Sequence, residues 1–241
     1  MSISFFILLF IVALLYASVG HGGASGYLAL MAIYGFAPDV MKPSALFLNL
    51  FVSLTSFIMF YRGGHFKWKL FLPFALASIP FSFLGGTISL DAVVYKKILG
   101  GLLLFPVIRF FFYPNTPQEN LRSSNFIFSV LIGAIIGFLS GLIGIGGGII
   151  LSPVLLLLNW TNQKQTAAIS ALFIFVNSIA GLIGQISKGI QINSSVYSYV
   201  AIAFVGGLMG AWLGSLKFNQ NILKFTLAIV LLMASVKLIL T

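Results

Sequence analysis

The sequence predicts an all-α integral membrane protein made of two homologous repeats that are inverted relative to each other. Three observations lead to this prediction: few charged residues, a succession of apolar runs, and motifs of the first half that recur in the second. Of the 241 residues, 60% are hydrophobic and 7% are charged, whereas a soluble domain has about 25% charged residues. Most of the surface must therefore face lipid, and we expect a multi-pass protein of the cell membrane.

Apolar runs follow one another along the whole chain, separated by short breaks that hold the charged and turn residues. At about 20 residues for each transmembrane helix, these runs predict about eight to ten transmembrane segments. The most polar break, 113–125, is predicted to link a first transmembrane repeat, 1–112, to a second, 126–241. The runs lie at 3–19, 27–36, 44–61, 68–90, 93–112, 126–142, 149–159, 166–187, 196–216 and 222–240.

Motifs that recur in the same order indicate that the second half is a duplicate of the first. A cluster of glycines, a Ser-Ala-Leu-Phe tetrapeptide and a basic residue followed by glycine occur once on each side of the linker. In the first half these motifs lie at 20–23, 44–47 and 62–63, and in the second half at 144–147, 170–173 and 188–189.

Two apolar runs, 27–36 and 149–159, are too short to cross a bilayer, since ten helical residues reach only about 15 Å. Each follows a glycine cluster, and the two hold matching places in the repeat. Short or glycine-interrupted segments at matched places in two halves indicate the binding site of a transporter. We expect the glycine clusters to be non-helical and the short helices to begin at or just after them.

The distribution of the 13 lysines and arginines predicts the topology. If each half crosses the membrane five times, one side receives eight of these charges and the other side five. If the short runs are re-entrant and each half crosses four times, the split is seven to six. Because cytoplasmic loops carry an excess of basic residues, five crossings are favoured, with inverted halves and both termini outside.

The glycine clusters are also the first candidate binding residues. They offer bare backbone N–H groups beside the start of a short helix, an arrangement that binds anions. The alternative is close helix packing, which glycine also permits. Neither cluster is followed by Gly-Lys-Ser/Thr, so neither is a nucleotide-binding phosphate loop. The candidates here are His21, Gly22, Gly23 and Ser25 in the first half, and Gly146, Gly147 and Gly148 in the second.

The segment Gly137–Gly148, followed by Pro153, resembles the signature of the TauE/SafE family of membrane transporters. The weaker partner 20–26 resembles it as well, and so do the shared Ser-Ala-Leu-Phe and the closing basic-glycine turn. The resemblance covers nearly the whole chain and implies export of sulfite or small organosulfonates. The first half departs from the usual run of glycines, because it contains His21 and Ser25.

Polar side chains inside the predicted helices complete the candidate site. An ionisable residue within a membrane is a functional hypothesis by default, so His21 could contact an anion or carry a proton with it; the alternative is a neutral imidazole bonded to a helix carbonyl. Hydroxyl and amide donors suit a sulfonate, although they also serve as helix–helix bonds. These donors are Ser44, Asn49, Ser170 and Asn177. No buried arginine is expected, so helix N-termini, helped by His21, would meet the anion's charge.

The sequence offers too few parts for an enzyme, since its three acidic residues lie near loops and no catalytic set can be assembled. No metal site or cofactor is expected, and the scattered basic residues do not form a nucleic-acid patch. We therefore expect a secondary transporter that exports a small anion through a site between the two glycine breaks. A passive anion channel and a non-transporting membrane scaffold are the alternatives. The lipid bilayer is the expected environment, and proton coupling and a homodimer stay open.

Overall fold

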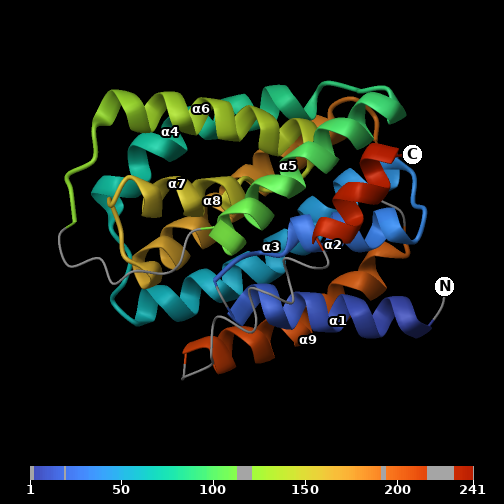
Figure 1. Cartoon of the computed structure of the whole chain (residues 1–241), viewed down its shortest axis with the longest axis horizontal. Coiled ribbons are helices and arrows are strands. Elements are labelled where there is room, and N and C mark those ends of the chain that lie inside the picture. Colours follow the sequence, from blue (N-terminus) through green and yellow to red (C-terminus); the bar gives the residue numbers. More distant parts are fainter. Residues whose placement is uncertain (1–2, 19, 113–120, 191–193, 216–230, 241) are drawn as a thin grey trace.

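The computed structural model describes the chain except for residues 1–2, 19, 113–120, 191–193, 216–230 and 241 (Figure 1). Every regular element in the described part is an α-helix, as predicted. In order these are α1 (Ile3–Ser18), α2 (Ala24–Ile33), α3 (Pro38–Arg62), α4 (Trp68–Gly86), α5 (Ala92–Phe112), α6 (Phe126–Ile143), α7 (Gly148–Leu157), α8 (Gln163–Ile186) and α9 (Val196–Ser215), followed by a last helix at Leu231–Leu240.

Five of the described helices, α3, α4, α6, α8 and α9, are long and apolar enough to cross a membrane. Large apolar side chains cover the outside of the bundle: Leu76 is 65% exposed and Ile135 is 62% exposed. Serines such as Ser53, Ser78 and Ser129 are fully buried instead. Apolar residues outside and polar residues inside are what a bilayer requires, which agrees with the predicted integral membrane protein.

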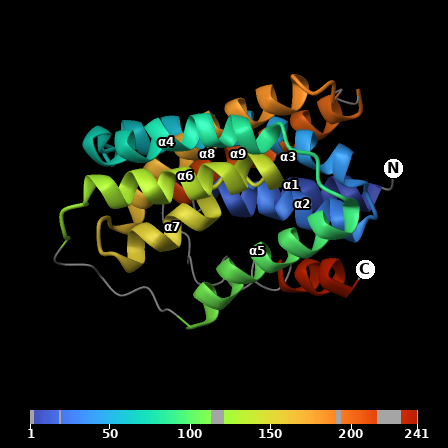
Figure 2. The same ribbon diagram turned by 90° about the horizontal axis from the view of Figure 1, so that it is seen from above.

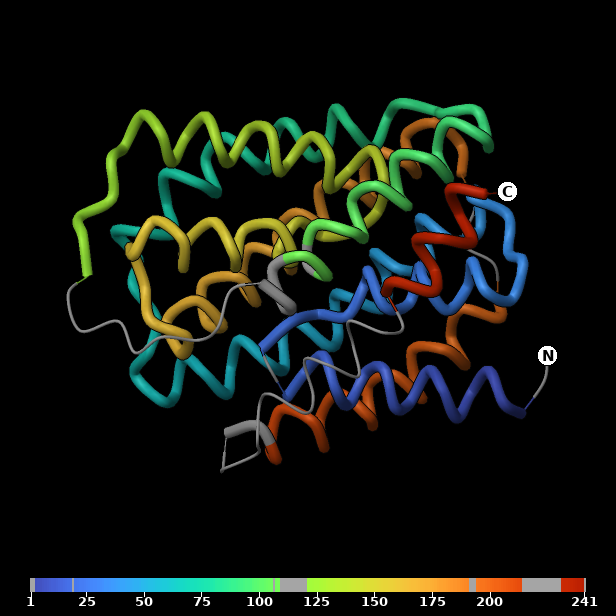
Figure 3. Tube along the Cα trace, in the orientation of Figure 1, coloured from blue at the N-terminus to red at the C-terminus, as the bar shows by residue number. Residues whose placement is uncertain are grey.

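The chain turns back on itself at the first glycine cluster, so that α1 and α2 form an antiparallel hairpin (Figure 3). At one end of this hairpin the hydroxyls of Ser4 and Tyr34 lie 2.8 Å apart. At the other end Ser25 Oγ donates to Tyr16 Oη at 2.8 Å. The short helix α2 therefore runs back along α1, and its ten residues span about 15 Å, half of the hydrocarbon thickness.

The second glycine cluster makes the same kind of hairpin from α6 and α7. The backbone N–H of Arg122, just before α6, donates to the carbonyl of Asn159, just after α7, at 2.8 Å. The open ends of the two helices are thus joined, and the glycine turn lies at the closed end. Both short helices reverse direction, as the five-crossing model requires, but each is too short to cross by itself.

Helices of the two halves pack in corresponding pairs (Figures 1 and 2). α3 packs against α8 in the middle, α4 packs against α6, and α9 packs against α1; α3 also contacts α9, as α8 contacts α4. By the repeat, α1, α3 and α4 of the first half correspond to α6, α8 and α9 of the second. Under this correspondence the α4–α6 pair becomes the α9–α1 pair, the α3–α9 pair becomes the α8–α4 pair, and the α3–α8 pair becomes itself. This pattern supports the predicted duplication, although the inverted repeats and the boundaries at 1–112 and 126–241 stay predictions.

Glycines set the close approach of α4 to α6. A Cβ at Gly133, Gly137 or Gly141 would strike the backbone of α4, at Phe74, Ser78 and Ser82 respectively. Glycine at every fourth position lets two membrane helices meet backbone to backbone. At the other pair, a Cβ at Gly206 would lie 2.6 Å from the carbonyl oxygen of Phe10, so α9 approaches α1 in the same way.

The hairpins sort the loops to two opposite ends of the bundle, and this gives a first testable prediction. Lys237 Nζ donates to the carbonyl of Ile33 at 2.7 Å, so the last described helix lies at the same end as the α2–α3 loop.

We expect single cysteines at Gly35 and Lys188 in this cysteine-free chain to react with a membrane-impermeant maleimide in intact cells. Those at His65 and Lys164 should react only after permeabilisation, because that end carries more basic residues. The reverse pattern would contradict the predicted orientation.

Candidate functional site

The two glycine turns meet at the contact between α3 and α8. A Cβ built on Gly22 would lie 2.7 Å from Asn49 Oδ1 and 2.8 Å from Ile174 Cγ2. A Cβ on Gly146 would lie 2.5 Å from Asn49 Nδ2 and 2.9 Å from the same methyl of Ile174. Both turns therefore touch the same two side chains, one from each central helix. Any larger residue at Gly22 or Gly146 would displace the Asn49 amide.

The last residue of each glycine turn is the N-cap of a short α-helix, and this residue has left-handed backbone angles. Gly23 has φ 93° at the N-cap of α2, and Gly147 has φ 79° at the N-cap of α7. Neither N-cap has a side-chain hydrogen bond, whereas Asn125 and Asn162 cap α6 and α8. The first-turn N–H groups of α2 and α7 thus lack the side-chain acceptor that helix N-termini use. The expectation of non-helical glycine clusters followed by short helices is confirmed.

Asn49 is fully buried between the two turns. We call the contact of Gly22, Gly146, Asn49 and Ile174 the Asn49 layer. Its Nδ2 donates to Ser178 Oγ at 3.2 Å, and its Oδ1 has no hydrogen-bond partner among the described residues. Rotating the amide by half a turn would let Ser178 donate to Oδ1 and would direct Nδ2 toward Gly22. Asn49 can therefore present either an acceptor or a donor to the first glycine turn.

His21 lies in the first glycine turn, partly buried, and hydrogen-bonds to Ser152 of the second half, which connects it to Ser170. Ser152 Oγ lies 2.8 Å from His21 Nε2 and 2.8 Å from Ser170 Oγ, and it donates to the carbonyl of Gly148 at 2.8 Å. A hydroxyl has one hydrogen to donate. Gly148, Ser170 and His21 are all within reach of that hydroxyl, so the tautomer of His21 decides whether Nε2 donates to Ser152 or accepts from it. The imidazole is thus held in the first glycine turn by a hydrogen bond to the second half.

The other predicted site residues lie further from this layer. Gly23 faces the Tyr27 ring, Ser25 bonds to Tyr16 within the hairpin, and Gly147 packs on apolar side chains. Ser44 is buried with an unpartnered hydroxyl. Asn177 Nδ2 donates to Ser78 Oγ at 3.0 Å and to a carbonyl of its own helix. The structure brings together His21, Gly22, Asn49, Gly146, Gly148 and Ser170, and it leaves Gly23, Ser25, Ser44, Gly147 and Asn177 outside that group.

Lys42 is a buried lysine in α3, although the sequence predicts a break between the apolar runs 27–36 and 44–61 at its position. Its side chain is 6% exposed, and Nζ lies 5.2 Å from the centre of the Tyr95 ring. A Cβ on Gly144, in the second glycine turn, would lie 3.1 Å from its Cα. One signal could have found it: the Ser-Ala-Leu-Phe repeat aligns Lys42 with Ala168, a fully buried residue of α8. The structure thus adds a buried lysine to the helix N-termini and His21, the groups expected to meet an anion's charge.

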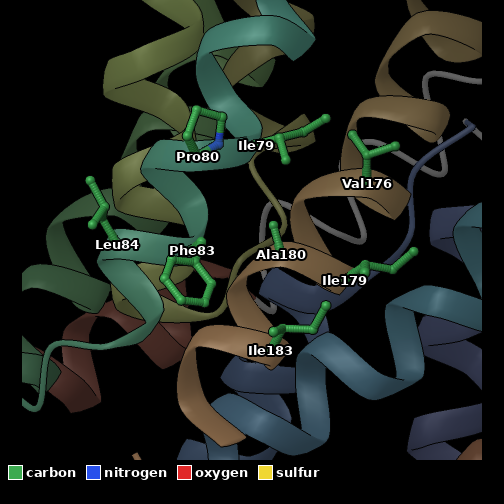
Figure 4. A pocket seen from close by; sticks show the side chains of 8 residues that line it. All are labelled: Ile79, Pro80, Phe83, Leu84, Val176, Ile179, Ala180 and Ile183. Atoms are coloured by element: carbon green, nitrogen blue, oxygen red, sulfur yellow. The ribbon is translucent and has the colours of Figure 1, made fainter. Parts of the chain in front are cut away.

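An apolar groove between α4 and α8 is the other prominent concave feature (Figure 4). Its volume is about 580 Å³, and nearly all of its surface is apolar. It opens on the outside of the bundle. Because its lining is apolar, it offers no side-chain donors to an anion. The residues that line it are Ile79, Pro80, Phe83, Leu84, Val176, Ile179, Ala180 and Ile183.

The family model described as "Sulfite exporter TauE/SafE" matches residues 5–238, nearly the whole chain. The chain belongs to the TauE/SafE family. This confirms the resemblance seen in the glycine-rich segments, and it places the glycine turns and Asn49 in the framework of a membrane transporter family. No solved structure matches this TauE/SafE chain.

Three curated relatives carry the name of probable membrane transporter proteins. The protein y4hK of Sinorhizobium fredii is 39% identical over 147 residues, which are 57% of each chain. A protein of Methanocaldococcus jannaschii is 31% identical over 147 residues, 57% of this chain and 55% of the relative. ORF9 of a Sinorhizobium species is 29% identical over 133 residues, 54% and 51%. The chain thus spans little more than half the length of these relatives, whose names are those of transporters and not of enzymes.

Proposed function

We propose that this TauE/SafE protein is a secondary transporter that exports a small anion, sulfite or an organosulfonate, between its two glycine turns. The observation that carries the proposal is the meeting of the two glycine turns, through Gly22 and Gly146, at the buried amide of Asn49, with each turn leading into a helix N-terminus that has no side-chain cap. The printed family description, sulfite exporter, supports the choice of substrate class.

The arrangement supplies what a partly dehydrated oxyanion needs. The starts of α2 and α7 follow directly on the turn residues that touch Asn49, and uncapped N–H groups and helix dipoles at such starts favour a nearby negative charge. Ser170, Ser178 and the rotatable amide of Asn49 add hydroxyl and amide donors. An anion that leaves water for this layer can therefore replace its lost hydrogen bonds with several protein donors.

The glycine turns are buried in this structure, so passage requires the two hairpins to move relative to α3 and α8. Each hairpin comes from a different half and approaches the Asn49 layer with its closed end. Opening one hairpin at a time would expose the layer to one side of the membrane and then to the other. The sequence contains no nucleotide-binding phosphate loop, so the driving force in this proposal is an ion gradient or the anion's own gradient.

Two measurements on purified protein test the proposal. Sulfite, methanesulfonate, sulfate and acetate are screened for thermal stabilisation, because a ligand at 100 times its Kd stabilises the folded state by about 2.7 kcal/mol. Flux of the stabilising anion is then followed in proteoliposomes. Saturable flux that stops when the opposing gradients are removed supports a transporter, and conductance without saturation supports the channel alternative. No binding and no flux of any of these anions would leave the scaffold alternative.

The two asparagines provide a matched pair of variants for this test. We expect Asn49→Leu to weaken anion binding about tenfold or more, since a hydrogen bond to a charged group contributes about 1.5–3 kcal/mol. Asn177→Leu breaks bonds to Ser78 and to the Phe173 carbonyl, so it should lower thermal stability and leave anion affinity unchanged. Equal affinities in both variants and wild type would remove Asn49 from the site.

A further inference from the structure

We propose that Lys42 is an anion-binding residue that pairs with the substrate on one side of the glycine turns, while His21 serves the opposite side. This inference rests on the proposed anion transport and adds a lysine side chain to it.

The central helices fix where Lys42 lies. Asn49 bonds to Ser178, and Gly181 packs against Leu46, so α3 and α8 are antiparallel. Lys42 precedes Asn49 by about 10 Å along α3, on the side where α8 ends. Ser170, which belongs to the His21 cluster, lies toward the start of α8. Lys42 and His21 are therefore on opposite sides of the Asn49 layer.

The surroundings of Lys42 are aromatic and backbone groups. Tyr95 presents its ring to the ammonium, and its hydroxyl donates to the carbonyl of Ile143 at 3.0 Å, at the end of α6. Gly144 brings the second glycine turn against the Lys42 backbone. An anion bound to the ammonium would thus lie directly beside the turn that leads to Asn49.

The chain has few carboxylates that could neutralise this lysine. Its acids are Asp39, Asp91 and Glu119. Asp39 and Asp91 are exposed, and each accepts backbone N–H bonds at the start of its helix; Glu119 lies outside the described residues. Within the described part Lys42 forms no ion pair, and a largely buried lysine side chain is favoured by a nearby counter-charge. A substrate anion would supply that counter-charge.

Lys42 and His21 each align with an apolar residue of the second half, so the two halves are chemically unequal. The repeat aligns Lys42 with Ala168, and His21 with Ile145. One side of the Asn49 layer therefore has a lysine, and the other has an imidazole that hydrogen-bonds to Ser152, which in turn hydrogen-bonds to Ser170. An anion crossing the layer would exchange an ammonium partner for hydroxyls and an imidazole, so its binding on the two sides would differ in pH dependence.

The test compares Lys42→Met, which keeps the length of the side chain, with Lys42→Arg and with wild type. Binding of sulfite and of methanesulfonate is measured by titration of the purified protein. Lys42→Met should bind about 10- to 100-fold more weakly, as loss of a charge-assisted hydrogen bond predicts, and Lys42→Arg should keep most of the affinity. Lys237→Met removes an equal charge from a lysine that bonds to the Ile33 carbonyl, and should lower stability but not affinity.

The outcomes separate this inference from the proposed function. Wild-type affinity in Lys42→Met would overturn the role of Lys42 and leave anion transport intact. Absence of binding in wild type would end both proposals. If Lys42→Met does not fold, Lys42→Cys decides, because the chain has no other thiol. An aminoethyl thiosulfonate, which restores an ammonium, should restore binding, and a methyl thiosulfonate should not; equal binding after both reagents would contradict the proposal.

Discussion

Replacing Gly22 with alanine should abolish anion flux in a protein that remains folded. Gly22 has no positive φ, so alanine meets no backbone strain at this position. Its Cβ would, however, lie 2.7 Å from Asn49 Oδ1 and 2.8 Å from Ile174 Cγ2. The amide and the methyl must move, at a cost of about 1–3 kcal/mol for overpacking. The added methyl occupies the space between the first glycine turn and Asn49, which the anion would need.

The matched control for this variant is Gly101→Ala. Gly101 lies in α5, and a Cβ there meets nothing within 4 Å. Alanine in a helix is more favourable than glycine by roughly 0.5–1 kcal/mol, so this variant should transport normally and be slightly more stable. Flux in proteoliposomes and thermal unfolding give both readouts. Wild-type flux in Gly22→Ala would show that the anion takes another path.

Replacing His21 with glutamine should flatten the pH dependence of anion binding. In wild type the imidazole hydrogen-bonds to Ser152, and an approaching anion would favour its protonated, positively charged form. Substrate and proton then bind together, and affinity rises as pH falls, by up to tenfold for each pH unit when one proton is taken up with each anion. Glutamine can still donate to Ser152 but cannot titrate between pH 5.5 and 8.

The probe for this experiment is methanesulfonate, because its own charge is constant over this pH range and sulfite's is not. His65→Gln is the control, since His65 is the other histidine of the chain. It lies in the α3–α4 loop, where burial and then the charge of Lys164 lower its pKa, so it stays neutral at physiological pH. Identical pH profiles for wild type and His21→Gln would make the histidine structural.

The helices and the glycine breaks could be predicted because both depend on local properties. Apolar composition alone requires helices in a bilayer, and only glycine adopts the left-handed backbone of Gly23 and Gly147 without cost. The start of α2 was placed too late, at 27, because Ser25 and Gly26 were assigned to the break. Gly23 already has the left-handed N-cap conformation, so the residues after it are free to be helical.

The residues that face each other across the bundle could not be predicted, because their partners are distant in sequence. Asn49 and Asn177 look alike in the sequence, yet one faces the glycine turns and the other bonds to α4. Ser152 was not a candidate, although it connects His21 to Ser170. Lys42 follows Pro38 and Asp39, which suggested a loop, and only the packing of α5 and the second glycine turn around it makes it buried.

The packing of α9 against α1 and of α4 against α6 also determines when each half can complete its structure during synthesis. Among the described helices α1 packs most extensively against α9, which follows it by most of the sequence. Until α9 is made, the α1–α2 hairpin, with its buried hydroxyls, must wait in the membrane with its packing surface covered by lipid or by the insertion machinery. Neither half has a finished interior alone, and assembly must be a late, cooperative step that depends on contacts between the two ends of the chain.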